Sequence, residues 1–211
     1  MGLFLTFEGP DGSGKSTQAH MLASELRARG HDVVETREPG GTQVGEAVRH
    51  VLLDLNGPEM SPRTMALLLS ASRAQLVSDV IVPALESGRT VIADRYTDST
   101  LAYQSYGFGL ETEVVHDLSR IATLGVTPDV TVLVDVPVDV GLERVFRRGA
   151  HNRLDAPDTA FHERVREGYH RLAAAEPTRW VTVDGTQDPR SVHRALMHKL
   201  APMLQEVAQP T

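Results

Sequence analysis

The stretch that decides the fold reads Gly9-Pro10-Asp11-Gly12-Ser13-Gly14-Lys15-Ser16, with Thr17 directly behind it. It matches the pattern G-x-x-x-x-G-K-[ST], and it lies between an apolar, β-prone run at residues 3–7 and a segment with apolar residues at helical spacing. In this context the glycines let backbone N–H groups converge on phosphate oxygens at the positive end of a helix. Lys15 is expected to reach the β- and γ-phosphates of a nucleoside triphosphate, and the Ser16 hydroxyl to ligate Mg²⁺.

The composition fits one ordinary α/β domain. Of the 211 residues, 41% are hydrophobic and 23% are charged, so we expect a single domain over residues 1–211. The formal net charge of -7 argues against broad nucleic-acid binding, and the absence of cysteine excludes disulfides and thiolate metal sites. No signal peptide is visible, and no apolar run approaches the ~18 residues that span a membrane. We therefore expect a cytoplasmic enzyme without a membrane or nucleic-acid partner.

Short β-branched runs alternate with longer helical segments along the chain. The expected strands cover residues 3–7, 32–36, 90–93, 130–136 and 180–183. Several of these runs are almost continuously apolar, as in parallel strands that helices cover on both faces. We predict a P-loop NTPase fold, with a five-stranded parallel sheet flanked by helices and ligands at the carboxyl ends of the strands.

Proline residues mark the starts of two expected helices. A long helix starts at residues 61–62, where a serine N-cap is followed by proline, and it runs toward Gly88. Pro83 is expected to kink or divide this helix, because proline lacks the backbone N–H. The last helix starts by the same logic at residues 188–189 and reaches about Leu204.

A polar, arginine-rich segment at about residues 147–157 separates two expected helices. Such a segment is usually a solvated loop. Behind a P-loop, however, phosphoryl transfer needs extra cations around the migrating γ-phosphoryl group. We therefore predict a small mobile lid, in which Arg148 and Arg153 supply positive charge to the reaction.

Two further arginines follow expected strands. Arg37 ends the second strand and Arg95 follows the third, so both are expected at the sheet edge that carries the P-loop. Two guanidinium groups at this edge can bind a second phosphate, although the neighbouring Glu38 and Asp94 offer alternative salt-bridge partners. A phosphomonoester is largely a dianion at neutral pH, so a phosphate acceptor needs positioning and charge stabilisation rather than a general base.

Taken together, several segments of the chain resemble bacterial thymidylate kinases. These are the loop with Asp11 and residues 36–42, 72–75, 94–96, 99–104 and 152–155. The resemblance extends from Leu3 to about Arg190. It implies transfer of the γ-phosphoryl group of ATP to dTMP, with Mg²⁺ as cofactor, which gives dTDP for dTTP synthesis. It also implies a homodimer that forms through the long central helices.

The resemblance assigns expected roles to individual residues. The ATP site would comprise Gly9, Pro10, Asp11, Gly12, Ser13, Gly14, Lys15, Ser16, Thr17 and Arg144. The catalytic residues would be Lys15, Arg95, Arg148 and Arg153. Some members of the family carry a catalytic arginine in the P-loop, where this chain has Gly12. The chain therefore resembles the members that use lid arginines instead.

The same resemblance assigns the dTMP site. Its residues would be Asp11, Arg37, Leu69, Arg73, Arg95, Ser99, Thr100, Tyr103 and Gln104. Arg73 would hydrogen-bond the thymine edge, and Tyr103 would pack on the deoxyribose, where a 2′-hydroxyl would clash. Leu69 stands where the family commonly has a phenylalanine that stacks on the base.

Other activities compatible with the P-loop remain open from the sequence. The acceptor of an alternative kinase would be another nucleoside monophosphate or a deoxynucleoside. A P-loop ATPase or regulatory switch would hydrolyse the nucleotide without an acceptor. A GTPase switch needs the guanine-reading N-K-x-D, and neither Lys15 nor Lys199 follows an asparagine.

Overall fold

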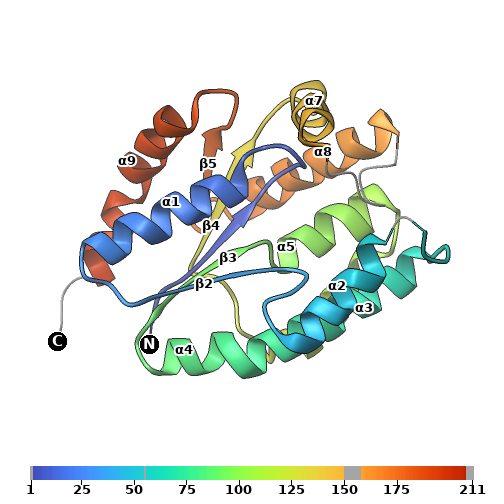
Figure 1. Cartoon of the computed structure of the whole chain (residues 1–211), viewed down its shortest axis with the longest axis horizontal. Coiled ribbons are helices and arrows are strands. Elements are labelled where there is room, and N and C mark those ends of the chain that lie inside the picture. The colour runs from blue at the N-terminus through green and yellow to red at the C-terminus, as the bar shows by residue number, and fades with distance from the viewer. Residues whose placement is uncertain (1, 55, 150–157, 208–211) are drawn as a thin grey trace.

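The structure, a computed structural model, describes residues 2–54, 56–149 and 158–207, the last three by their backbone alone. Its strands are β1 (Phe4–Glu8), β2 (Val33–Arg37), β3 (Thr90–Asp94), β4 (Val130–Asp135) and β5 (Trp180–Asp184). They form one parallel sheet in the order β2-β3-β1-β4-β5 (Figure 1). The predicted fold class is confirmed, and each strand lies within about a residue of its expected position.

Helices cover both faces of this sheet and so bury its central strands, such as β1 and β4, on both sides. The helices are α1 (Lys15–Ala28), α2 (Gln43–Leu53), α3 (Pro62–Leu76), α4 (Val82–Glu86), α5 (Thr97–Thr100), α6 (Thr112–Thr123), α7 (Val138–Arg148), α8 (Thr159–Ala175) and α9 (Pro189–Val207). On one face α1 packs over β1, β2 and β3, and α9 lies beside it over β5, with Leu22 and Leu196 in their shared core (Figure 1). On the other face a second cluster joins Phe4 and Val91 to α3 and α4.

The long helix at residues 62–86 is divided, as its proline predicts. The Ser61 side chain caps α3 by accepting a hydrogen bond from Thr64 N at 3.2 Å. The chain then widens into a π-helical segment, η1 (Val77–Ile81), before α4 begins with Pro83 in its first turn. The wider turn fits a proline, which cannot donate the regular bond and whose ring crowds the preceding turn.

The same helix corrects one sequence expectation. The helix at Pro62–Glu86 contains an 18-residue window with a mean hydropathy of 1.4, so it is long and apolar enough to cross a membrane by length and composition alone. The expectation overlooked this stretch because Arg73 and Asp79 interrupt the apolar run. In the fold one face of this helix, including Leu76 and Ile81, is buried against the sheet. The segment is a core helix of this domain.

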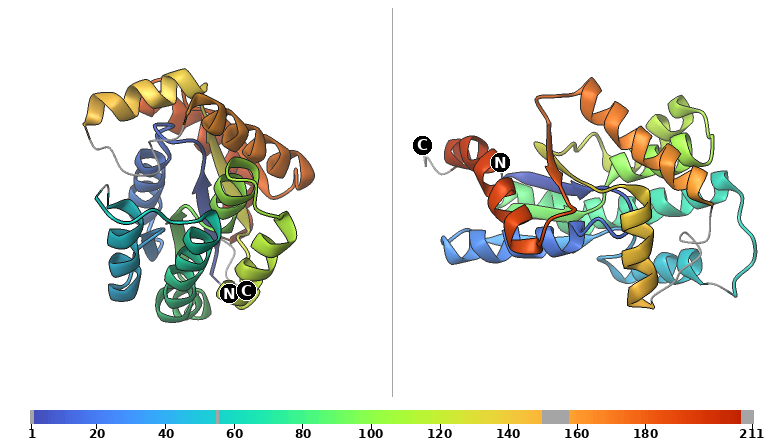
Figure 2. Two further views of the ribbon diagram at one scale, coloured as in Figure 1. Left: turned by 90° about the vertical axis from the view of Figure 1, so that its right-hand side faces the viewer. Right: turned by 90° about the horizontal axis from the view of Figure 1, so that it is seen from above.

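The loops that follow β1, β2 and β3 gather at one edge of the sheet. Figure 2 looks onto this edge in its left view, and α2, α7 and α8 are arranged around it. A π-helical segment, η2 (Leu101–Gly107), continues α5 and packs against α8. The site described below is built on these loops and helices, at the edge where a doubly wound sheet binds its ligands.

Candidate active site

The P-loop is seated tightly between β4 and α7. Gly12 has φ +75, and a Cβ at this position would lie 2.1 Å from the carbonyl oxygen of Gly141 on α7. Only glycine fits such a close approach at positive φ. A P-loop arginine at position 12 is therefore incompatible with this packing, so any additional catalytic cation must come from another segment.

The side chains that follow the loop face the same edge of the sheet. Lys15 is buried, and its Nζ donates to Pro10 O at 3.3 Å and lies 3.9 Å from Asp11 Oδ1. Ser16 and Thr17 are exposed in the first turn of α1. Arg144 of α7 donates to Gly185 O at 2.8 Å, Thr186 O at 3.2 Å and Gly12 O at 3.4 Å. Arg144, an expected residue of the ATP site, thus joins the P-loop to the turn after β5.

Asp94 is a candidate metal ligand that the sequence analysis did not identify. The Ser16 hydroxyl donates to Asp94 Oδ2, whereas Asp94 Oδ1 is buried and has no hydrogen-bond partner in the described part of the chain. A hydroxyl beside a carboxylate suits Mg²⁺, which prefers oxygen ligands and takes few of them from the protein. The described residues contain no cluster of three His, Cys, Asp or Glu that could hold a metal.

Arg95 lies at the centre of the expected acceptor site, with its backbone at φ +73. Its Nη2 donates to Asp11 Oδ1 at 2.6 Å, and its Nη1 donates to Ser99 Oγ at 3.0 Å and Tyr169 OH at 3.1 Å. Tyr103 OH donates to Asp11 Oδ2 at 2.6 Å. Although burial opposes its ionisation, Arg95 and Lys15 hold the pKa of Asp11 below its usual value. Asp11 therefore anchors Arg95 as a carboxylate.

These contacts correct the salt bridges that the sequence suggested as alternatives. Arg95 pairs with Asp11 rather than with Asp94. Arg37 donates to Glu46 Oε1 at 2.9 Å, and both side chains are about half exposed. Glu46 also accepts a hydrogen bond from the backbone N–H of Gly41 at 3.0 Å, which fixes it beside Arg37.

Glu38, the other suggested partner of Arg37, instead forms a fully buried pair with Arg73. The Nε and Nη2 atoms of Arg73 donate to Glu38 Oε2 at 2.9 and 2.6 Å. Nη2 also donates to Thr100 Oγ1 at 2.9 Å. The remaining nitrogen, Nη1, is buried without a hydrogen-bond partner among the described residues, and so is Gln104 Oε1. These two atoms are available to a ligand that offers one acceptor and one donor.

A cavity of about 300 Å³, the substrate cavity, joins the P-loop to these groups. Its lining includes the expected site residues Asp11, Gly12, Lys15, Ser16, Arg37, Leu69, Arg73, Arg95, Ser99, Thr100, Tyr103, Gln104 and Arg148. Leu69 is half-buried in its wall, and Arg148 is exposed at the end of α7. Arg49 also lines the cavity and was missed, because nothing in its helical sequence context distinguishes it. Arg153 and residues 150–157 of the expected lid lie outside the described residues.

The P-loop and a second, arginine-lined region share one cavity at one edge of the sheet, which defines a P-loop kinase for a small phosphorylated acceptor. A family model described as thymidylate kinase matches residues 7–196. The chain belongs to the thymidylate kinase family.

Individual relatives agree with this assignment over nearly the whole chain. The thymidylate kinase of Roseiflexus sp. (strain RS-1) is 45% identical over 221 residues, which cover 99% of this chain and 98% of the relative. That of Deinococcus radiodurans is 51% identical over 186 residues, covering 88% and 90%. The crystal structure of thymidylate kinase from Ehrlichia chaffeensis matches with a TM-score of 0.77 at 34% identity, covering 94% of this chain and 98% of that one.

Proposed function

We propose that this chain phosphorylates dTMP to dTDP with ATP as phosphate donor. One observation carries the proposal beyond family membership: Lys15 and Ser16 of the P-loop line the same cavity as the buried Arg73 and the largely buried Arg95. Donor and acceptor can therefore meet without a large rearrangement of the sheet edge. Direct transfer in such a site depends on positioning and on cations around the migrating group.

The charged groups of the cavity divide between the two substrates in this proposal. Lys15 and the N–H groups of the P-loop hold the phosphates of ATP, and Ser16 and Asp94 hold Mg²⁺, which offsets phosphate charge when bound. Arg95 and Arg37 bind the phosphate of dTMP. Arg148 and Arg153 complete the charge around the transferred group.

Base recognition rests on the two unpartnered atoms of the cavity wall. Arg73 Nη1 donates to a carbonyl of thymine, and Gln104 Oε1 accepts from the ring N–H. Cytosine would turn its amino group toward Arg73 Nη1, which is also a donor, and its unprotonated ring nitrogen toward Gln104 Oε1, which is also an acceptor. Both Arg73 Nη1 and Gln104 Oε1 would then stay unsatisfied. Leu69 covers the base with an aliphatic face, and Tyr103 excludes a 2′-hydroxyl.

A panel of acceptors tests the proposal. With ATP as donor, we expect ADP release to be fastest with dTMP and slower with dUMP, UMP, CMP and thymidine. A ribonucleotide or a nucleoside that outperforms dTMP would contradict it. ATP hydrolysis that does not depend on any acceptor would instead favour the ATPase alternative.

We further propose that the chain works in the cytoplasm, because its substrates are soluble small molecules. We also propose that it forms a homodimer. Exposed apolar residues occur on three helices that pack side by side, α2, α3 and α6. They are Val44, Val51, Leu67, Val114 and Ile121. Exposed apolar side chains on adjacent elements are typical of an interface.

Leu67→Glu is expected to convert the dimer to a monomer, because it places a charge on this apolar face. Size-exclusion chromatography with light scattering measures the change in mass. Ser24→Glu, which adds the same charge at an exposed position of α1, should leave the mass unchanged. A wild-type monomer, or a dimer that survives Leu67→Glu, would count against this interface.

A further inference from the structure

Glu8 is a fully buried carboxyl group that has no role in the site described so far. It ends β1, directly before the P-loop, and it does not line the substrate cavity. Its Oε1 accepts a hydrogen bond from Tyr96 N at 2.8 Å. Its Oε2 accepts from Ser99 Oγ at 2.5 Å and from Tyr169 OH at 3.1 Å. One carboxyl group thereby joins β1 to the β3–α5 junction, to α5 and to α8.

The same two hydroxyls contact Arg95. Arg95 Nη1 donates to both Ser99 Oγ and Tyr169 OH. Each hydroxyl has one proton to donate and lone pairs to accept with, whereas an ionised carboxylate only accepts. The two hydroxyls also lie 2.9 Å from each other. An ionised Glu8 can accept the protons of both, so that both hydroxyls offer lone pairs to the guanidinium. Burial raises the pKa of Tyr169, which keeps its hydroxyl protonated for this purpose.

The backbone supports the same arrangement. Glu8 accepts a hydrogen bond from the backbone N–H of Tyr96, the residue directly after Arg95. Arg95 has a φ of +73, which is unusual for a residue with a side chain. Such a conformation persists when its surroundings hold it. Glu8 thus restrains Arg95 twice, at the adjoining peptide and at the far end of the guanidinium.

We propose that Glu8 is a positioning residue for the acceptor phosphate, because its carboxylate orients Ser99 and Tyr169 and through them the guanidinium of Arg95. This rests on the proposed function, in which Arg95 binds the phosphate of dTMP. Glu8 itself does not touch the substrate.

The protonation state of Glu8 sets the condition under which this support operates. Burial, and then the nearby charge of Asp98, raise the pKa of Glu8 to about 7, against the opposing effects of Ser99 and Arg95. Lys15 from α1 and Arg73 from α3 also interact with the charge of Glu8. A protonated Glu8 must itself donate to Ser99 or Tyr169, and it then competes with Arg95 for their lone pairs. The support is therefore about half present near pH 7, nearly complete by about pH 8, and lost as the pH falls.

Glu8→Gln tests the proposal with a nearly isosteric change. The glutamine oxygen can still accept from Tyr96 N, but its amide must donate to the hydroxyls at every pH. The hydrogen bonds from the charged Arg95 to Ser99 and Tyr169 are then weakened. We therefore expect the KM for dTMP to rise about 10-fold and the KM for ATP to stay unchanged. The ratio of variant to wild-type KM for dTMP should be about 10 at pH 8 and approach one at about pH 6. Titration of the dTMP phosphate cancels in this ratio.

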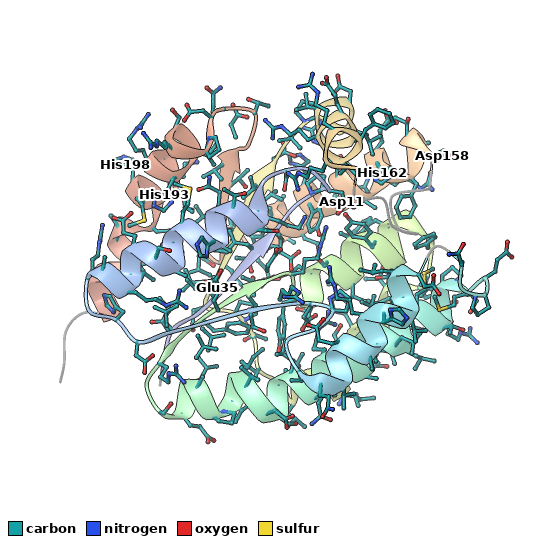
Figure 3. All side chains as sticks on the ribbon, viewed as in Figure 1. Asp11, Glu35, Asp158, His162, His193 and His198 are labelled. Carbon is teal, nitrogen blue, oxygen red and sulfur yellow. The ribbon has the colours of Figure 1, made fainter. Side chains whose placement is uncertain are left out.

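Matched variants separate positioning from simple destabilisation. Glu35→Gln changes a carboxyl group on β2, away from Asp11 (Figure 3), and should alter neither KM. Tyr169→Phe removes one of the two hydroxyls, so its effect should combine with that of Glu8→Gln less than additively. If Glu8→Gln does not fold, Tyr169→Phe alone should show a KM ratio that shrinks below about pH 7.

Some results would overturn the proposal. A KM ratio that does not change with pH, full additivity of the two variants, or a parallel loss of ATP affinity would each assign Glu8 a structural role only. Absence of dTMP phosphorylation by the wild-type chain would instead refute the proposed function, so the two failures are distinguishable.

Discussion

Arg73→Met is expected to lower the free energy of unfolding by about 3–5 kcal/mol, because it leaves the carboxylate of Glu38 buried without its partner. Both side chains are almost completely buried, with 1% and 3% of their surface exposed. Methionine fills part of the volume of the arginine stem, so the loss comes mainly from the stranded charge rather than from a cavity. Denaturant unfolding, with the midpoint and the slope measured separately, gives the change in stability.

The pH dependence of this loss identifies its cause. Burial raises the pKa of Glu38 even while Arg73 opposes the shift. Without Arg73 the folded-state pKa of Glu38 rises further above the unfolded value, so the loss of stability begins once the pH exceeds the unfolded value and is largest above the raised folded-state value. The deficit of Arg73→Met should therefore be small in acid and grow toward neutral pH.

Two further variants provide controls. Adding Glu38→Gln to Arg73→Met removes the buried charge and should recover part of the lost stability. Arg63→Met changes an exposed arginine on the same helix and should have little effect. A deficit that is independent of pH and unaffected by Glu38→Gln would mean that packing, not charge, explains the loss.

The sequence predicts the parts of this protein that depend on local pattern. Apolar β-branched runs located the strands, and the glycine spacing located the loop at residues 9–16, because both reflect short-range geometry. The Ser61 cap and Pro83 likewise predicted where a helix starts and where it changes.

The pairing of charges depends on long-range geometry, which the sequence does not display. Glu38 and Arg73 are 35 residues apart, and Asp11 and Arg95 are 84 apart. The sequence suggested neighbours along the chain instead, pairing Arg37 with Glu38. In an extended segment consecutive side chains point to opposite sides, so this pair was geometrically unfavourable from the outset.

Glu8 and Asp94 illustrate a signal that the sequence analysis passed over. Each is a carboxylate at the end of a nearly continuous apolar strand, directly before a loop of the expected site. A charged residue in that position is exposed to the ligand or is buried with polar partners. Either outcome makes it a candidate for the site, although the sequence alone does not separate the two.

Arg95→Ala is expected to raise the KM for dTMP about 100-fold, because truncating a largely buried, hydrogen-bonded charge costs several kcal/mol in binding. The side chain of Arg95 is 17% exposed and is fixed by Asp11, Ser99 and Tyr169 before any substrate arrives. A guanidinium held in this way loses little freedom when it binds a phosphate. Steady-state kinetics with each substrate varied in turn should show the change in the KM for dTMP and little change in that for ATP.

Arg37→Ala supplies the matched comparison within the same site. The Arg37 side chain is 53% exposed and pairs with Glu46, which is 46% exposed, so solvent screens its charge. We expect its loss to raise the KM for dTMP only about threefold, in line with the small contributions of exposed ion pairs. Arg95→Lys should fall between the two alanine variants, since it keeps the charge but loses the planar pair of donors that matches a phosphate. If Arg37→Ala proves the more damaging change, or if Arg95→Ala lowers kcat with the KM for dTMP unchanged, then Arg95 acts in the transition state and Arg37 is the principal anchor of the acceptor.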